Sequence, residues 1–258
     1  MTSYDSLAEV YEWLISDAKL PPAEFAAAFD DALSLVPSNA RVLDCSCGTG
    51  QLAVGLAGRG MEVVATDASA AMVRRTAELA EECGASVRTL RADWQELPDH
   101  FGDATFDAVF CVGNSLHHAQ GASGRAAALA SMSRLLRRGG HLVLTSRNWE
   151  LVRSRGSRLD ISDRLVRRNG HDAVVIYRWD IAPQWADEHH IEIAIAQVDA
   201  TGPVRVRSEL LSSWPYRHDQ LEDELQSVGL RTVSNTFNPD AENYTVIATK
   251  ALARDSSL

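Results

Sequence analysis

The sequence predicts an α/β protein with a mostly parallel sheet and an antiparallel addition. Between residues 41 and 146, short apolar runs alternate with segments of helical periodicity, which is typical of parallel strands joined by helices. The first apolar run leads into two glycines, Gly48 and Gly50, and the second run ends at Asp67. After residue 149 the apolar period changes to two, which favours antiparallel strands with one face in solvent.

The first 36 residues are predicted to be helical. Apolar side chains recur at helical spacing before the Pro21-Pro22 pair, and the same period continues after it. We assign residues 1–38 to an N-terminal helical cap. Its aromatic side chains, Tyr11 among them, suit a segment that covers a site.

The core is expected to span residues 39–148 and to contain five strands separated by helices. Ser69 is a suitable N-cap for the helix after the second strand, because its hydroxyl can accept a hydrogen bond from a free backbone amide. The last helix of the core is predicted over residues 125–138, before Gly139-Gly140. The predicted strands are residues 41–45, 62–67, 86–92, 106–112 and 141–146.

An antiparallel element is expected at residues 149–216, inserted before the chain returns to the core. Residues 217–258 are predicted to close the core with a helix and two strands, and Asp219 with Glu222 resembles a capping box at the start of that helix. The closing strands are predicted at residues 231–236 and 243–250. The complete sheet is expected to be Rossmann-like, with seven strands that are mostly parallel and a last strand that is antiparallel.

Composition and charge exclude several classes of protein. With 258 residues and a formal net charge of -10, the chain is large enough for one elaborated domain and too acidic to favour a phosphate backbone as a partner. No apolar run approaches the roughly 20 residues that cross a bilayer, and the N-terminus lacks the basic and apolar regions of a secretory signal. We therefore expect a cytoplasmic protein without nucleic-acid or membrane partners. The four cysteines are expected to be free thiols, and no metal site is predicted.

The turn after the first strand is the strongest functional signal. Gly48 and Gly50 allow the backbone to approach a ligand closely, because glycine has no Cβ. Asp67, at the end of the second strand, can accept hydrogen bonds from the hydroxyls of a ribose. Asp44 stands four residues before Gly48 and would repel a pyrophosphate. It suits instead a ligand that presents a cationic amine.

Two later segments complete the predicted ligand. Asp93-Trp94 follows the third strand and offers an adenine a polar acceptor and a flat apolar surface. Residues 113–118 bring polar and aromatic groups to the carboxyl ends of the strands, where ligands bind in such sheets. A ligand with an amine, a ribose, an adenine and no phosphate is S-adenosylmethionine. The alternative is an NAD(P)-dependent oxidoreductase, because residues 48–53 loosely satisfy the dinucleotide fingerprint.

These segments resemble class I S-adenosylmethionine-dependent methyltransferases, and the glycine N-methyltransferase-like group of small-molecule enzymes is the most similar. The resemblance covers about residues 40–148 and the closing strands. It implies methyl transfer from S-adenosylmethionine to a nitrogen, carbon or oxygen atom of a small molecule. The matching stretches are residues 44–50, 67–69, 93–94, 113–118 and 147–149.

The resemblance also implies roles for individual residues. Arg147 matches the arginine that in the family grips the acceptor's carboxylate. Where the acceptor must lose a proton, His118 or Tyr11 could serve as the base. The cofactor would be held by Asp44, Gly48 and Gly50 at its methionine part, by Asp67 at the ribose, by Met72, Asp93 and Trp94 at the adenine, by Val112 and Asn114 beside the sulfonium, and by Tyr11 from the cap.

The acceptor is predicted to be a small molecule that bears a carboxylate or an aromatic ring, such as an amino-acid derivative or a natural product. It would enter between the cap and the inserted strands, where aromatic residues suit a compact substrate; these are Tyr4, Tyr11, Trp179, Trp214 and Tyr216. Glycine itself is not favoured, because residues 149–176 contain no tyrosine, whereas the glycine enzymes are tyrosine-rich after the arginine motif. A peptide acceptor is the alternative.

Overall fold

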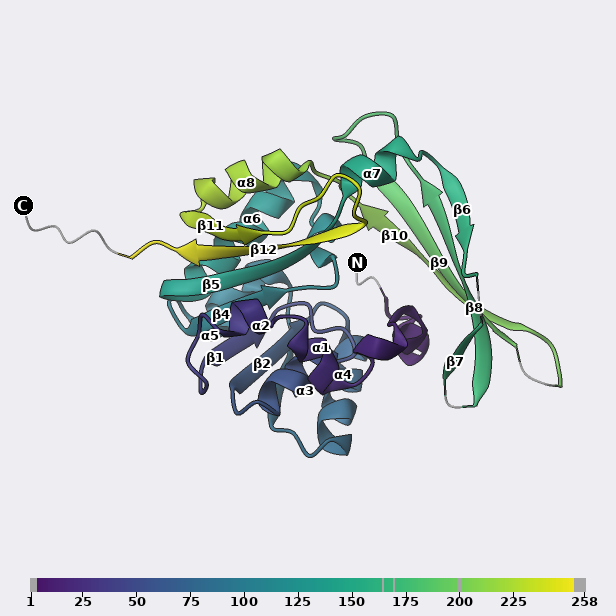
Figure 1. Cartoon of the computed structure of the whole chain (residues 1–258), viewed down its shortest axis with the longest axis horizontal. Helices are drawn as coiled ribbons and strands as arrows, with labels where there is room; N and C mark the ends of the chain where they lie inside the picture. The colour runs from purple at the N-terminus through teal and green to yellow at the C-terminus, as the bar shows by residue number, and fades with distance from the viewer. Residues whose placement is uncertain (1–3, 164, 169, 199–200, 253–258) are drawn as a thin grey trace, which may run out of the picture.

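The computed structural model describes residues 4–163, 165–168, 170–198 and 201–252, which form two sheets (Figure 1). The segments 1–3 and 253–258, at the ends of the predicted cap and closing region, lie outside the described residues. The larger sheet has the strand order β11-β12-β5-β4-β1-β2-β3. Its strands are β1 (Arg41–Asp44), β2 (Glu62–Asp67), β3 (Val87–Arg91), β4 (Phe106–Cys111), β5 (Leu136–Arg147), β11 (Leu230–Asn235) and β12 (Asn243–Lys250).

The predicted fold class is confirmed. Strand β1 pairs in parallel with β2 and β4, and β4 pairs in parallel with β5. The last strand, β12, is antiparallel to both of its neighbours, β5 and β11. The sheet is therefore a mostly parallel, Rossmann-like sheet with the predicted antiparallel last strand.

The helices pack on both faces of the larger sheet. One buried cluster joins Leu43 and Val109 to Leu129 of α6, and the other joins Val42 and Phe110 to the side of α3. The strands therefore read as continuous apolar runs. The helices are η1 (Ala8–Leu14), η2 (Asp17–Lys19), α1 (Pro22–Ala27), α2 (Asp30–Leu33), α3 (Gln51–Ala57), α4 (Ala70–Glu82), η3 (Trp94–Glu96), α5 (Leu97–Phe101), η4 (Ser115–His118), α6 (Gly121–Leu135), α7 (Trp149–Ser154) and α8 (His218–Ser227), where η marks a 3-10 helix.

The second sheet is antiparallel and projects from the core beside the N-terminal segment (Figure 1). A third buried cluster holds it in place, in which Val10 and Trp13 of η1 pack against Ile193 and other residues of the sheet's inner face. The N-terminal segment therefore lies between the core and the second sheet. The strands are β6 (Arg158–Ile161), β7 (Val166–Arg168), β8 (His171–Asp180), β9 (His189–Val198) and β10 (Arg205–Ser213).

Local signals predicted some boundaries well and others wrongly. Ser69 caps α4 as expected, since its hydroxyl accepts a hydrogen bond from the Met72 amide at 3.1 Å. The predicted helix over residues 125–138 ends three residues early, at Leu135, because Leu136 pairs with Phe106 and already belongs to β5. Within the described residues, no helix is both long and apolar enough to span a bilayer.

The predicted capping box at Asp219 is wrong. Helix α8 begins at His218, so Asp219 lies inside its first turn and not at its N-cap. The carboxylate of Glu222 does not return to the helix start, because it accepts hydrogen bonds from the side-chain Nδ2 of Asn235 and the Thr232 hydroxyl of β11. A contact between α8 and β11 therefore takes the place of the predicted capping contact within α8.

Candidate active site

Two adjoining cavities lie at the carboxyl ends of the strands of the larger sheet. The larger cavity, of about 340 Å³, extends from Asp44 and Gly48 to Arg147 at the end of β5. The smaller cavity, of about 210 Å³, lies over Asp67 and Trp94. Tyr4 and Ser46 line both cavities and therefore mark the place where they meet.

The turn between β1 and α3 requires glycine. Gly50 has a φ of +95°, and a Cβ built on it would lie 2.9 Å from the Cα of Thr76 in α4. Gly48 has a φ of +52° and faces the ring of Tyr11, whose Cε1 would lie 3.8 Å from such a Cβ. The turn therefore packs against α4 on one side and opens to the larger cavity on the other.

Asp67 holds this turn while facing the smaller cavity. Its Oδ2 accepts a hydrogen bond from the Gly48 amide at 3.0 Å, and its Oδ1 accepts one from the Ser69 amide at 2.9 Å. Burial raises the pKa of the Asp67 carboxyl, and these two bonds oppose that rise. Trp94 is fixed nearby by a hydrogen bond from its Nε1 to the Cys45 carbonyl at 2.8 Å. Asp93 lines the same cavity.

Asp44 is a buried carboxyl with one oxygen that lacks a hydrogen-bond partner among the described residues. It is fully buried at the end of β1, and its Oδ1 accepts a long hydrogen bond of 3.4 Å from the Ser46 amide. Its Oδ2 has no hydrogen-bond partner among the described residues. Burial raises the pKa of Asp44 to about 7. A buried carboxyl of this kind is completed by a cationic hydrogen-bond donor, since few buried polar groups stay unpaired.

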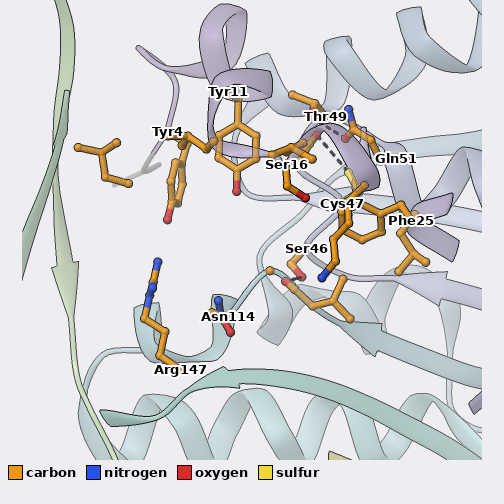
Figure 2. Close-up of a pocket in the computed structure, with 18 of the residues that line it drawn as sticks. Tyr4, Tyr11, Ser16, Phe25, Ser46, Cys47, Thr49, Gln51, Asn114 and Arg147 are labelled. Carbon is orange, nitrogen blue, oxygen red and sulfur yellow. Dashed lines mark hydrogen bonds between the residues drawn. The ribbon is translucent and has the colours of Figure 1, made fainter. Parts of the chain in front are cut away.

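Arg147 reaches the larger cavity from the opposite side, as predicted from its place at a strand end. Figure 2 shows its guanidinium and the ring of Tyr4 directed toward one another. The guanidinium carbon lies 5.2 Å from the centre of the Trp179 ring. In the described part of the chain, Arg147 Nε has no hydrogen-bond partner, and no ion pair to its guanidinium is present. A half-buried cation of this kind suits an anionic ligand group.

The loop after β4 lies between these two charges. The Val112 carbonyl accepts hydrogen bonds from the hydroxyls of Ser46 and Ser115, at 3.1 and 2.8 Å. Asn114 adopts a left-handed conformation with a φ of +64°, and its amide donates to the Thr145 hydroxyl at 3.1 Å. Its Oδ1 is unpaired among the described residues. Val112 and Asn114 therefore line the larger cavity through a rigid loop.

The two histidines that follow occupy different cavities. His118, the predicted base, lines the smaller cavity, and it is His117 that lines the larger one with Arg147. His118 Nδ1 lies 2.9 Å from the Ser212 carbonyl, so it carries the proton, and Nε2 accepts a hydrogen bond from the Tyr4 hydroxyl at 3.0 Å. Burial lowers the pKa of His118 to about 4, and burial also lowers the pKa of His117.

Three tyrosines surround the larger cavity. Tyr4 and Tyr11 come from the N-terminal segment, with ring centres 5.6 Å apart in an edge-to-face arrangement. Tyr177 comes from β8 of the second sheet. Burial raises the pKa of Tyr11 to about 12, so its phenol stays protonated at neutral pH. The wall is therefore aromatic and polar without adding a negative charge.

The structure leaves five of the predicted residues out of both cavities, and one of them is Gly50, whose turn packs against α4. Met72 belongs to the first turn of α4, is 2% exposed and lines neither cavity. Tyr216 is buried in the core, where its hydroxyl bonds to that of Ser146 at 2.9 Å. Trp179 supports Arg147 from behind, and Trp214 bonds through its amide to the His117 carbonyl.

Lys19 and Tyr177 are the most informative of the lining residues that the sequence did not predict. Lys19 of η2 lines the larger cavity together with Ser46 and Asn114, and its signal was its rarity, since the chain has only two lysines, Lys19 and Lys250. Tyr177 stands two residues before Trp179 in a strand of period two, so both face inward. The described residues contain no group of three or more His, Cys, Asp or Glu side chains placed to hold a metal ion.

Known sequences match the core of the chain. Residues 42–140 match a family model described as a methyltransferase domain. The glycine/sarcosine N-methyltransferase of Aphanothece halophytica is 34% identical over 116 residues, which cover 45% of this chain and 43% of that relative. The match therefore spans less than half the length of that curated relative.

Comparison with solved structures covers nearly the whole chain. The CcbJ methyltransferase from Streptomyces caelestis superposes with a TM-score of 0.76 at 20% identity, over 97% of this chain and 99% of its own. S-adenosylmethionine-bound CalS10, an amino pentose methyltransferase from Micromonospora echinaspora, gives a TM-score of 0.72 at 22% identity, over 94% and 95% of the two chains. At these identities the likeness shows a shared fold.

Proposed function

We propose that this chain, in which residues 42–140 form a class I S-adenosylmethionine-dependent methyltransferase domain, methylates an amine of a small, carboxylate-bearing molecule. The observation that carries the proposal is the pair of opposite charges in one cavity. The free oxygen of Asp44 suits the ammonium of the methyl donor, and the guanidinium of Arg147 suits the carboxylate of the acceptor.

The residues present fit S-adenosylmethionine. Asp44 and the Gly48 turn would hold the amino-acid part, with Lys19 supplying a cation for its carboxylate. Asp67 would accept hydrogen bonds from the ribose, and an adenine would fit in the smaller cavity beside Asp93 and Trp94. Val112, Asn114 and Tyr11 would surround the sulfonium.

The dinucleotide alternative fits less well. Asp44 lies at the place where the glycine turn would meet a pyrophosphate, and burying a second anion beside a desolvated carboxyl is costly. Nothing in the comparisons favours an oxidoreductase. The cavity, which is lined by the N-terminal segment as well as the second sheet, also favours a small acceptor over a peptide.

The chain's own residues would bind, orient and exclude water. When bound, S-adenosylmethionine supplies a methyl group on a sulfonium, which is already a good electrophile. Arg147 would fix the acceptor's carboxylate, and Tyr4 and Tyr11 would close the cavity over the reacting groups. Orientation of this kind can contribute about 7–11 kcal/mol of barrier reduction.

No strong base is required of the protein. The pKa of His118 is lowered to about 4 by burial, and burial also lowers the pKa of His117. Both imidazoles are therefore neutral and weakly basic, which suits an amine that binds unprotonated. The name of the glycine/sarcosine N-methyltransferase relative also specifies methylation at nitrogen.

The acceptor should carry an apolar body larger than that of glycine. Ile191 and Ile193 of β9 and Leu211 of β10 line the larger cavity on the side of Arg147. Apolar side chains favour an apolar partner by about 25 cal/mol per Å² of buried surface. An amino acid or amino sugar acid with an apolar or aromatic group satisfies both the cation and this wall.

The proposal is tested by supplying methyl-labelled S-adenosylmethionine with panels of amines and measuring product mass. We expect label in compounds that carry both a carboxylate and an apolar group, and less in their esters. Label transfer to none of the small molecules, or binding of NAD(P) in preference to S-adenosylmethionine by calorimetry, would contradict the proposal.

A further inference from the structure

The N-terminal segment covers the place where the two cavities meet. We call residues 4–14, which include η1, the strap. Tyr4 of the strap lines both cavities, and Tyr11 lines the larger one. The Tyr4 hydroxyl bonds to His118 Nε2, and its ring meets that of Tyr11 edge to face. A ligand that occupies both cavities would therefore lie beneath the strap.

One carboxylate of the second sheet binds the start of the strap through three hydrogen bonds. Glu209 of β10 accepts from the Tyr4 amide at 2.6 Å through Oε1. Its Oε2 accepts from the Ser6 amide at 3.1 Å and from the Ser6 hydroxyl at 2.7 Å. All three donors belong to the strap, so a single side chain fixes the backbone on both sides of Asp5.

The strap has other polar contacts, which include an exposed ion pair, a contact with the N-cap of α4 and, at its far end, a hydrogen bond from Arg168 of β7 to the Glu12 carbonyl. Arg207 of β10 pairs with Glu9 at 2.6 Å, and both side chains are largely exposed. The carboxylate of Asp5 accepts a hydrogen bond from the Ser69 hydroxyl. Exposed ion pairs contribute little to stability. Glu209 is therefore the principal polar contact between the second sheet and the part of the strap that carries Tyr4.

The same strands also line the cavity. In the sheet register, Glu209 stands opposite Ile193 of β9, and Leu211 lies two residues farther along β10. Ile193 and Leu211 both line the larger cavity. The wall proposed for the acceptor and the anchor of the strap are thus parts of one rigid pair of strands.

We propose that Glu209 is a positioning residue that latches the strap over the bound methyl donor and sets the rate at which the donor and its demethylated product leave. The inference rests on the proposed function for the identity of that ligand. Removing the carboxylate leaves the amides of Tyr4 and Ser6 to bond with water, so the strap opens more often while the residues beneath it stay in place.

The test compares Glu209→Ala with a matched control, Glu192→Ala. Glu192 is an acidic residue of the neighbouring strand, and its carboxylate pairs with Arg178 of β8 at 2.8 Å. Dissociation of labelled S-adenosylmethionine and of S-adenosylhomocysteine is followed after dilution. We expect Glu209→Ala to release both about tenfold faster, equivalent to about 1.4 kcal/mol, and Glu192→Ala to match the wild type.

Two further measurements separate a latch from a general loss of structure. Glu209→Gln keeps one carbonyl oxygen and should restore part of the slow release, and Ser6→Ala, which removes one of the three bonds, should have a smaller effect than Glu209→Ala. Hydrogen–deuterium exchange in the ligand-free protein should be faster in the strap of Glu209→Ala and unchanged in α6.

The outcomes distinguish this inference from the proposed function. Equal release rates and equal strap exchange in Glu209→Ala and wild type would overturn the latch. A wild-type protein that fails to bind S-adenosylmethionine would contradict the proposed function instead, and the exchange measurement would still decide whether Glu209 holds the strap.

Discussion

The two sides of the larger cavity carry opposite charges and arise in different ways. Asp44, at the end of β1, is a buried carboxyl whose second oxygen has no partner within the described residues. Arg147, at the end of β5, belongs to the same sheet but faces a wall that β8, β9 and β10 supply from the second sheet. The first side comes from one short motif, whereas the second is assembled from distant segments. The larger cavity can therefore bind a cationic group beside Asp44 and an anionic group beside Arg147, each at its own side.

The largest effect is expected at Asp67, which faces the smaller cavity and holds the glycine turn of the acidic side. Asp67→Ala removes both the ribose acceptor and the two hydrogen bonds that hold the glycine turn. Since each bond to a charged group is worth about 1.5–3 kcal/mol, we expect the Kd for S-adenosylmethionine to rise by about 100-fold or more. The matched control is Glu62→Ala, at the opposite end of β2. Glu62 pairs with Arg41 near the surface, so its loss should leave this Kd unchanged. Calorimetry measures both, and equal affinities would contradict the role of Asp67.

The basic side should affect the acceptor and not the donor. Arg147→Ala is expected to raise the KM of a carboxylate-bearing acceptor by about 10- to 100-fold, because a charge-assisted pair is lost. The Kd of the methyl donor should stay the same. Arg158→Ala is the matched control, since Arg158 lies 4.6 Å from the same Trp179 ring but pairs with Asp160 outside the cavity. An unchanged acceptor KM in Arg147→Ala would contradict the proposal that the Arg147 guanidinium binds the acceptor's carboxylate.

The smallest expected effect is on the free energy of unfolding, when a Cβ is added to Gly50 in the turn that forms the acidic side. Gly50→Ala would place a Cβ 2.9 Å from the Cα of Thr76 at a φ of +95°. Gly60→Ala has a similar φ of +86° but no atom of the described chain within 4 Å of its Cβ. The additional loss of unfolding free energy in Gly50→Ala should be about 1–3 kcal/mol, because only that variant adds a backbone clash. Denaturant unfolding compares the two, and equal losses would show that φ alone matters.

The sequence predicted the acidic side better than the basic side, for a physical reason. Asp44 and the glycines lie within seven residues, and a strand followed by a helix fixes them relative to each other. Period two predicted that β8 and β9 are antiparallel strands, but it does not specify which face meets the core. Tyr177 lines the larger cavity, whereas Tyr216 packs against Ser146 in the core. The sequence alone offered no reason to place these two tyrosines differently.

Other differences come from contacts between distant segments. His117 and His118 are neighbours in a short 3-10 helix with ring centres 4.0 Å apart, yet they line different cavities, and the sequence could not decide which one meets Arg147. Met72 was expected near the adenine, yet its side chain is buried in the first turn of α4 and lines neither cavity. Glu209 had no local signal at all, because its partners lie about two hundred residues away in the chain.

The most direct test of the charge on the acidic side is the pH dependence of donor binding. Burial raises the pKa of Asp44 to about 7 in the ligand-free protein, so below that pH the carboxyl is mostly neutral. A cationic ligand selects the ionised form, and binding at lower pH must therefore release a proton. Calorimetry in buffers of different ionisation enthalpy should show this proton, and the Kd for S-adenosylmethionine should rise by about tenfold for each pH unit below 7. Asp44→Asn should remove the dependence; a Kd that stays constant between pH 8 and 5.5 in the wild type, with no proton released, would contradict the account.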